Sequence, residues 1–217
     1  MPEATLVRNE PAGEGLRWLI FDHVPAGYER PGQFVTATLG EHKPNYFALA
    51  SSPGAPAELL IKDAGPLASE LCALQPGARV QMSDAMGKGF GVTLEGELVV
   101  LCNGSAISAC RPVIEAELAA GLPRPVHFYL GVLTPAHRAF LADLERWGNA
   151  GITVHTVVGQ PEGTGWSGAT GFVQDLAQSH GLCRADVELL LCGVPPMVEA
   201  AKALWTEAGC TQVLTNF

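Results

Sequence analysis

The chain has 217 residues, of which 47% are hydrophobic and 16% are charged, and its formal net charge is -9. This apolar content supports packed cores and excludes a disordered chain, and the acidic balance without a Lys/Arg cluster argues against a nucleic-acid surface. The length allows two domains of roughly 100 residues each. No apolar run reaches the roughly 18 residues that cross a bilayer, and the first residues do not resemble a signal peptide, so we expect a cytoplasmic protein.

The first part of the chain, up to about residue 95, consists of short β-patterned runs separated by turn residues. The runs read TLVR, LRWLIFDH, QFVTATL, YFALAS, ELLIKD and RVQMSD. Short strands with Gly and Pro between them are typical of an antiparallel barrel or sandwich. One helix is predicted, LASELCALQ, between Gly65-Pro66 and Pro76-Gly77. We therefore expect an all-β first domain, 1–95.

The second part of the chain alternates apolar strands with amphipathic helices. Strands such as ELVVLCN, VHFYLGV, ITVHTVV and VELLLCG are followed by helical segments such as ACRPVIEAELAAG, PAHRAFLADLERWG and PPMVEAAKALWTEAG. A parallel sheet covered on both faces requires this pattern. The sequence predicts a doubly wound α/β domain, 96–217, with the boundary near 93–97.

Cysteine and histidine spacing gives no sign of a metal centre. The cysteines are scattered without a C-x-x-C pair, and the histidines show no ligand spacing. We expect most of these thiols to be buried and to pack like small apolar residues. The six are Cys72, Cys102, Cys110, Cys183, Cys192 and Cys210.

Two glycine turns follow strands of the α/β domain, at the sheet edge where ligands bind in such folds. In VVLCNGSAISA, Gly104 and Ser105 open a helix and could let backbone N–H groups approach a pyrophosphate. In LLLCGVPPMVEAA, Cys192 ends a strand, Gly193 frees the backbone, and Pro195 begins a helix. Both turns also fit an ordinary capped connection, with Cys192 simply buried, and spacing alone leaves these alternatives open.

Several motifs in a fixed order resemble the ferredoxin reductase family over nearly the whole chain. CGVPPM resembles that family's C-G-x-P-x-M signature, YFALASSP its flavin-binding strand, and IKDAGPLASEL the turn and helix that hold the flavin pyrophosphate. PGQFVTATL and GWSGATGFVQDL fall in the same order. The run MGKGF and the ending VLTNF are similar to the reductase-like group first noticed in ripening fruit.

The resemblance implies a barrel that holds FAD and an α/β domain that binds NADH or NADPH. It places Cys192 beside the reacting carbon of the nicotinamide, as the catalytic candidate. It implies a flavin site with a ring-lining strand, a phosphate-binding turn and a covering aromatic: Phe47, Ala48, Leu49, Ala50, Ser51, Lys62, Gly65, Leu67, Ser69 and Phe217. It implies a dinucleotide site formed by Gly104, Ser105, Gly193, Pro195 and Met197. No metal residue is implied.

The sequence also departs from the family at several of these positions. The flavin strand R-x-Y-S is replaced by Asn45-Tyr46-Phe47-Ala48, which removes the Arg that binds pyrophosphate and, with it, a charge-assisted bond of about 1.5–3 kcal/mol. Ala106 stands where the family has a glycine, and Leu133 where it often has an arginine, with Arg138 farther along the predicted helix. Without a clamp for a 2'-phosphate, NADH is favoured over NADPH.

The leading hypothesis is a flavin-dependent oxidoreductase that passes a hydride from NAD(P)H to FAD and electrons to an unidentified acceptor, which could be a protein. The altered Arg, Tyr and Ser positions of the flavin strand motivate an alternative. In that alternative the protein is a degenerate relative that acts as a binding or electron-transfer subunit without nucleotide turnover. Bound flavin and its response to dinucleotide distinguish the two.

Overall fold

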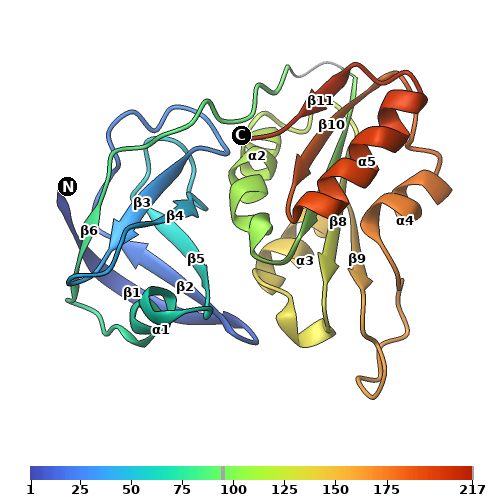
Figure 1. Ribbon diagram of the computed structural model, residues 1–217. Helices are drawn as coiled ribbons and strands as arrows, with labels where there is room; N and C mark the ends of the chain where they lie inside the picture. Colours follow the sequence, from blue (N-terminus) through green and yellow to red (C-terminus); the bar gives the residue numbers. More distant parts are fainter. Residues whose placement is uncertain (94–95, 217) are drawn as a thin grey trace.

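The computed structural model describes residues 1–93 and 96–216, so the predicted role of Phe217 lies outside the described residues. An antiparallel sheet of six strands comes first, and a parallel sheet of five strands flanked by helices follows it (Figure 1). The two units lie side by side, with α2 of the second unit facing the first. The two-part fold class expected from the sequence is confirmed.

The antiparallel sheet curls until its first and last strands meet. The strand order is β4-β3-β6-β1-β2-β5, and the bridge between Leu49 and Leu59 joins the end of β4 to β5. Alternate side chains such as Val35, Ala37 and Met82 point into one core and are fully buried. The strands are β1 Glu3–Gly13, β2 Leu16–Phe21, β3 Phe34–Thr38, β4 Asn45–Ala48, β5 Glu58–Lys62 and β6 Arg79–Met82, and the helix is α1 Pro66–Ala73. We refer to this unit as the barrel.

The parallel sheet has the order β11-β10-β7-β8-β9, with helices on both faces. Its central strands are apolar on both sides, as a sheet covered twice requires. The strands are β7 Glu97–Asn103, β8 Val126–Val132, β9 Thr153–Val158, β10 Val187–Cys192 and β11 Gln212–Leu214. The helices are α2 Ile107–Ala119, α3 Leu141–Asn149, α4 Val173–Ser179 and α5 Pro195–Glu207, with short 3-10 turns η1 Gly104–Ala106 and η2 Pro135–His137.

One hydrophobic cluster joins the two units. It contains the α2 and α3 side of the parallel sheet, with Val100 and Trp147, and also Leu16, Ala50 and Leu60 from the barrel. The opposite face of the parallel sheet packs separately against α4 and α5. The seam between the barrel and the α/β unit is therefore a packed interface, which fixes their relative position.

The segment 135–148, predicted as one helix, is interrupted. It forms η2, then an irregular stretch, then α3, and Phe140 has a φ of 54° at the start of α3. The ring of Phe140 lies edge-on to Trp18 of the barrel at 5.3 Å. This contact across the seam accompanies a backbone conformation that a continuous helix does not allow.

A buried ion group lies at the amino end of the parallel sheet. Arg124 donates to Glu117 at 2.6 Å and to Glu188 at 2.7 Å, and the Arg124 side chain is 4% exposed. Glu188 also accepts hydrogen bonds from the backbone and hydroxyl of Thr93, in the connection between the two units. The strand predicted from VELLLCG is thus apolar except for Glu188, whose buried charge is bonded to Arg124 and Thr93.

None of the helices formed by residues 1–93 and 96–216 is long and apolar enough to span a membrane.

Candidate functional site

The predicted flavin strand ends at the seam between the units. Ala48 and Ala50 contact the shared cluster, whereas Leu49 points into the barrel core and is fully buried. The carbonyl of Ala50 accepts a hydrogen bond of 2.8 Å from Nη1 of Arg111 on α2. The α/β unit therefore holds the backbone of this strand directly.

The side chains of β4 alternate between two environments. Phe47 is paired with Val35 of β3, is half-buried and packs against the barrel core. Tyr46 lies on the other face with Ala48, is 73% exposed, and meets Phe34 edge-on at 5.6 Å. The family resemblance of the sequence indicated Phe47 and did not indicate Tyr46. Strand alternation nevertheless places Tyr46 on the same face as Ala48.

Ser51 carries a buried hydroxyl with no hydrogen-bond partner among the described residues. Ser51 is 2% exposed, and the carbonyl of Ser51 accepts a hydrogen bond from the hydroxyl of Tyr28. Burial raises the pKa of Tyr28, so this hydroxyl stays protonated and donates. A buried hydroxyl without a partner costs free energy, and a polar ligand edge at this strand would satisfy it.

The turn before α1, which was predicted to hold the flavin pyrophosphate, is open. Gly65 has a φ of 89°, no atom lies within 4 Å of the position a Cβ would take, and no side chain caps the helix. Lys62 is exposed, and none of the described carboxylates pairs with it. The hydroxyl of Ser69 donates to Asp63 at 2.5 Å, so an acidic group occupies part of this site, and Leu67 is buried behind it. Helix N–H groups and Lys62 remain to hold an anion.

The two glycine turns of the α/β unit differ in packing: the turn at Gly104 is open, whereas the turn at Gly193 is tightly packed. Gly104 has a φ of 54° with no atom near its missing Cβ, and Ser105 continues the short 3-10 turn. A Cβ on Gly193 would overlap Oδ1 of Asn103 and lie 2.7 Å from Cε of Met197. Oδ1 of Asn103 accepts a hydrogen bond of 3.0 Å from the backbone N of Val194.

Asn103 was not recognised from the sequence, because its role depends on a partner that lies 91 positions away. Pro195 begins α5 directly after this contact, and buried Met197 lies in its first turn. The two predicted nucleotide turns are thus brought together at one edge of the sheet.

Cys192 ends β10 beside two other thiols. It is the register partner of Cys102 in β7, and both lie in the cluster that contains Cys110 of α2. The hydrogen bond with Cys110 raises the pKa of the Cys192 thiol, and burial raises it further, so the group is a neutral thiol. Its Sγ lies 3.8 Å from Oδ1 of Asn216, and Nδ2 of Asn216 donates to the carbonyl of Gly32 in the barrel.

Three exposed apolar side chains lie just after β8, just before α4 and just after β10. Leu133, Phe172 and Val194 are 51%, 66% and 54% exposed. Arg138 lies between η2 and α3 rather than inside a helix, and its guanidinium stacks over Trp166 at 5.3 Å. Its Nε donates to the carbonyl of Pro135 at 3.0 Å. Arg138, the first cation along the chain after Leu133, therefore contacts an aromatic ring and a backbone carbonyl.

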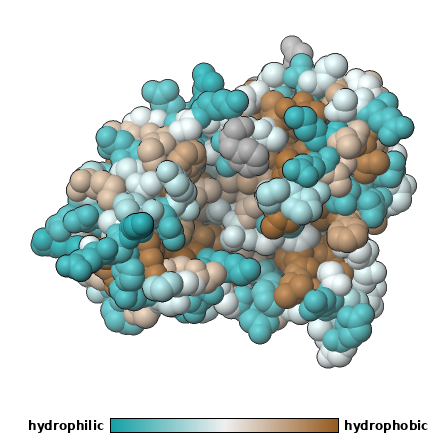
Figure 2. Space-filling view, viewed as in Figure 1, coloured by the Kyte–Doolittle hydropathy of each residue, from teal (hydrophilic) through white to brown (hydrophobic). Residues whose placement is uncertain are grey.

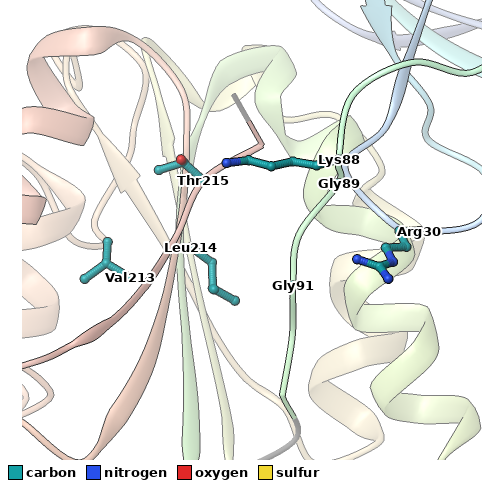
Figure 3. Close-up of a pocket in the computed structure, with 7 residues that line it drawn as sticks. All are labelled: Arg30, Lys88, Gly89, Gly91, Val213, Leu214 and Thr215. Atoms are coloured by element: carbon teal, nitrogen blue, oxygen red, sulfur yellow. The ribbon is translucent and has the colours of Figure 1, made fainter.

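A pocket of about 270 Å³ opens where the C-terminal strand meets the barrel (Figure 3). It is lined by Arg30, Lys88, Gly89, Gly91, Val213, Leu214 and Thr215. Arg30 and Lys88 come from different segments, and neither forms an ion pair with any described carboxylate. In a chain of net charge -9 this seam pocket is a local positive region. On the side of the molecule shown in Figure 2, hydrophobic residues are dispersed among hydrophilic ones.

Across the described ranges, no group of three or more His, Cys, Asp or Glu side chains is arranged to hold a metal ion.

Comparison with known proteins agrees with this geometry. The family described as "Oxidoreductase NAD-binding domain" matches residues 100–203, which cover both nucleotide turns. A solved structure of a ferredoxin NADP+ reductase from Neisseria gonorrhoeae, with bound FAD and NADP, matches 99% of this chain and 97% of that one with a TM-score of 0.82 at 17% identity. Residues 100–203 thus match an oxidoreductase NAD-binding family, and the whole chain has the fold of a ferredoxin reductase.

Two curated relatives match most of the chain. The fruit protein pKIWI502 of Actinidia deliciosa is 28% identical over 202 residues, which cover 84% of this chain and 63% of the relative. An NAD(P)H-flavin reductase of Aliivibrio fischeri is 23% identical over 201 residues, which cover 88% of this chain and 85% of the relative. This chain therefore spans less than two thirds of the fruit protein's length. The family resemblance seen in the sequence is confirmed.

Proposed function

We propose that the protein is a FAD-dependent NAD(P)H oxidoreductase, in which residues 1–95 hold FAD and residues 96–217 present the dinucleotide. The observation that carries this proposal is the meeting of the two predicted sites at one seam. Ala50 of the flavin strand and Cys192 of the nucleotide turn belong to the same buried cluster. Two cofactors held by these elements would face each other across the seam.

The residues at the seam fit an FAD molecule. The unpartnered hydroxyl of Ser51 would bond the polar edge of its ring, and Lys62 with the open turn at Gly65 would hold its phosphates. When bound, FAD supplies the redox chemistry by accepting a hydride from reduced nicotinamide and passing electrons on. The neutral thiol of Cys192 would contact the nicotinamide without adding a charge.

NADH is the favoured dinucleotide. A 2'-phosphate needs a cation, and the exposed side chain at the end of β8 is Leu133. Arg138, the nearest alternative, is stacked on Trp166. Steady-state rates with each dinucleotide test this preference, and Leu133→Arg should shift it toward NADPH. Equal use of both dinucleotides by the unmodified protein would contradict it.

The electron acceptor that fits the surface best is an acidic one, either a protein or a small anion. The seam pocket presents Arg30 and Lys88 beside the C-terminal strand, close to Asn216, which contacts Cys192. Attraction between opposite charges speeds association and weakens with salt. Acceptor reduction that slows as salt rises, with unchanged flavin reduction, would support this site.

A second candidate function is a binding or electron-transfer subunit without nucleotide turnover. Two observations favour it: Asn45 stands at the position of the family's pyrophosphate-binding Arg, and Asp63 engages Ser69 where phosphates would lie. The visible spectrum of the purified protein, before and after FAD and then NADH without oxygen, separates the candidates. Flavin bands that bleach with NADH support the oxidoreductase, and bound flavin that stays oxidised supports an electron-transfer subunit. Protein that takes up no FAD supports a binding role.

A further inference from the structure

Arg111 crosses the seam between the α/β unit and the barrel. It lies on α2, about one helical turn after the first residue of that helix, and its side chain is 13% exposed. Its Nη1 donates to the carbonyl of Ala50 at 2.8 Å and to Oε2 of Glu58 at 2.9 Å. Its Nε donates to Oδ2 of Asp143 at 2.7 Å. One side chain thus binds the flavin strand, a barrel strand and α3.

Two aromatic rings fix the plane of the Arg111 guanidinium. Its central carbon lies 5.3 Å from the ring of Trp18 and 5.1 Å from the ring of Phe140. These rings meet edge-on, and Nε1 of Trp18 donates to Glu58 at 3.1 Å. A rotation of Arg111 would break bonds on both sides of the seam, so the group defines a single arrangement of the two units.

This geometry needs arginine. A guanidinium is planar and presents several N–H donors in a fixed fork, whereas the lysine ammonium is a single flexible point charge. The three acceptors of Arg111 lie in different directions from one planar group. Lysine could keep one ion pair here but not the bonds to Ala50, Glu58 and Asp143 together.

We propose that Arg111 is a positioning residue that sets the separation between the flavin strand and the dinucleotide turn. Arg111 binds the carbonyl of Ala50 from α2, the helix that directly follows that turn. Reacting atoms must be placed to within about 1 Å, because a misplacement of that size can lower a rate about 100-fold. This inference rests on the proposed function for its effect on rate, but its effect on the arrangement of the units is independent of any cofactor.

Arg146 provides a matched control. It binds the same Asp143, at 2.8 Å, and also Glu115, at 2.5 Å, so it belongs to the same ion network. Both of its partners lie in the α/β unit, and Arg146 forms no bond across the seam to any described residue. Arg146→Gln therefore removes a charge from the network without releasing the barrel.

The first arm of the test measures the arrangement of the units without cofactor. Residual dipolar couplings of backbone amides report the orientation of the barrel relative to the α/β unit. We expect Arg111→Met and Arg111→Lys to change this orientation or broaden it, and Arg146→Gln to leave it unchanged. The lysine variant keeps the charge, so it remains informative if the methionine variant does not fold.

The second arm measures flavin reduction by saturating NADH without oxygen, in stopped flow. We expect Arg111→Lys to lower the limiting rate about tenfold or more while the NADH concentration for half-maximal rate changes less than about twofold. Arg146→Gln should stay within about twofold of the unmodified protein in both quantities. A loss of thermal stability alone would not produce this separation.

The proposal is overturned if the Arg111 variants keep the native orientation, or if they lower only the melting temperature and leave the limiting rate unchanged. If NADH fails to reduce flavin bound to the unmodified protein, the proposed function fails instead. The orientation measurement would still decide whether Arg111 sets the seam.

Discussion

The side-chain oxygen of Asn103, at the end of β7, accepts a hydrogen bond of 3.0 Å from the backbone N of Val194, which follows β10. Gly193 makes this contact possible, because its missing Cβ leaves room for the Asn103 amide and for Met197. The bond ties together the two turns that would hold a dinucleotide. The glycine of the CGVPPM motif therefore has a steric reason in this chain.

Gly193→Ala should disturb this edge of the sheet. The new methyl group would overlap the Asn103 amide and crowd Met197, so the Asn103–Val194 bond would break or α5 would shift. We expect a loss of about 1–3 kcal/mol in the free energy of unfolding and weaker NADH binding. Urea unfolding and NADH titration measure both.

Gly148→Ala is the matched control for this change. Gly148 lies in α3 with no atom within 4 Å of its missing Cβ, so alanine should stabilise the helix by about 0.5–1 kcal/mol. If Gly193→Ala is as well tolerated as Gly148→Ala, the steric account of the turn is wrong.

Asn45→Arg should restore a phosphate contact that this chain lacks. Asn45 is exposed at the start of β4, and a charge-assisted hydrogen bond contributes about 1.5–3 kcal/mol. We expect FAD to bind about tenfold more tightly, as followed by quenching of flavin fluorescence. Gln81→Arg adds the same charge on exposed β6. An equal gain in both variants would indicate general attraction instead of a site at residue 45.

Arg124→Met should strongly destabilise the protein. It would leave Glu117 and Glu188, each with a side chain 1% exposed, without their shared cation. Removing one partner of a buried ion group costs about 3–5 kcal/mol. Urea unfolding of Arg79→Met provides the comparison, because the Arg79–Glu3 pair is 72% and 57% exposed and should contribute less than about 1 kcal/mol. Equal losses would mean that the buried group is solvated in solution.

Stability should fall as the pH drops through the range in which histidine titrates. His155 stacks on Tyr129 at 4.9 Å, and its ring lies 4.7 Å from that of His180. Burial lowers the pKa of His155, and the neighbouring His180 and His127 lower it further. The unfolded chain takes up this proton near pH 6.5 and the folded chain only at lower pH, so stability is complete above that value and declines below it.

His155→Gln should therefore flatten the dependence of unfolding free energy on pH between about pH 7 and pH 5. His42→Gln serves as the control, because His42 lies on the barrel and pairs with Glu70. Unfolding in urea at several pH values gives the slopes. An unchanged slope in His155→Gln would show that the histidine group does not resist protonation.

The strand and helix order could be predicted because each element carries a local signal. Apolar β7 and β10 and the Pro-led start of α5 are examples. The interruption at Phe140 could not, since it accompanies a contact with Trp18 on the barrel. Local motifs likewise indicated Cys192 and Gly193. Asn103 and Arg111 were missed because their roles depend on distant parts of the chain. Their partners, Val194 and Ala50, become neighbours only in the folded chain.

The sheet order has a consequence for synthesis of the chain on the ribosome. β7 pairs with β8 on one side and with β10 on the other. The side of β7 that faces β10 therefore stays unpaired until Cys192 has left the ribosome, although the barrel strands are complete at Met82. An apolar strand with an unpaired edge is prone to associate with other chains. The nascent protein thus passes through a long interval in which one edge of the apolar strand β7 is exposed to other nascent chains and to chaperones.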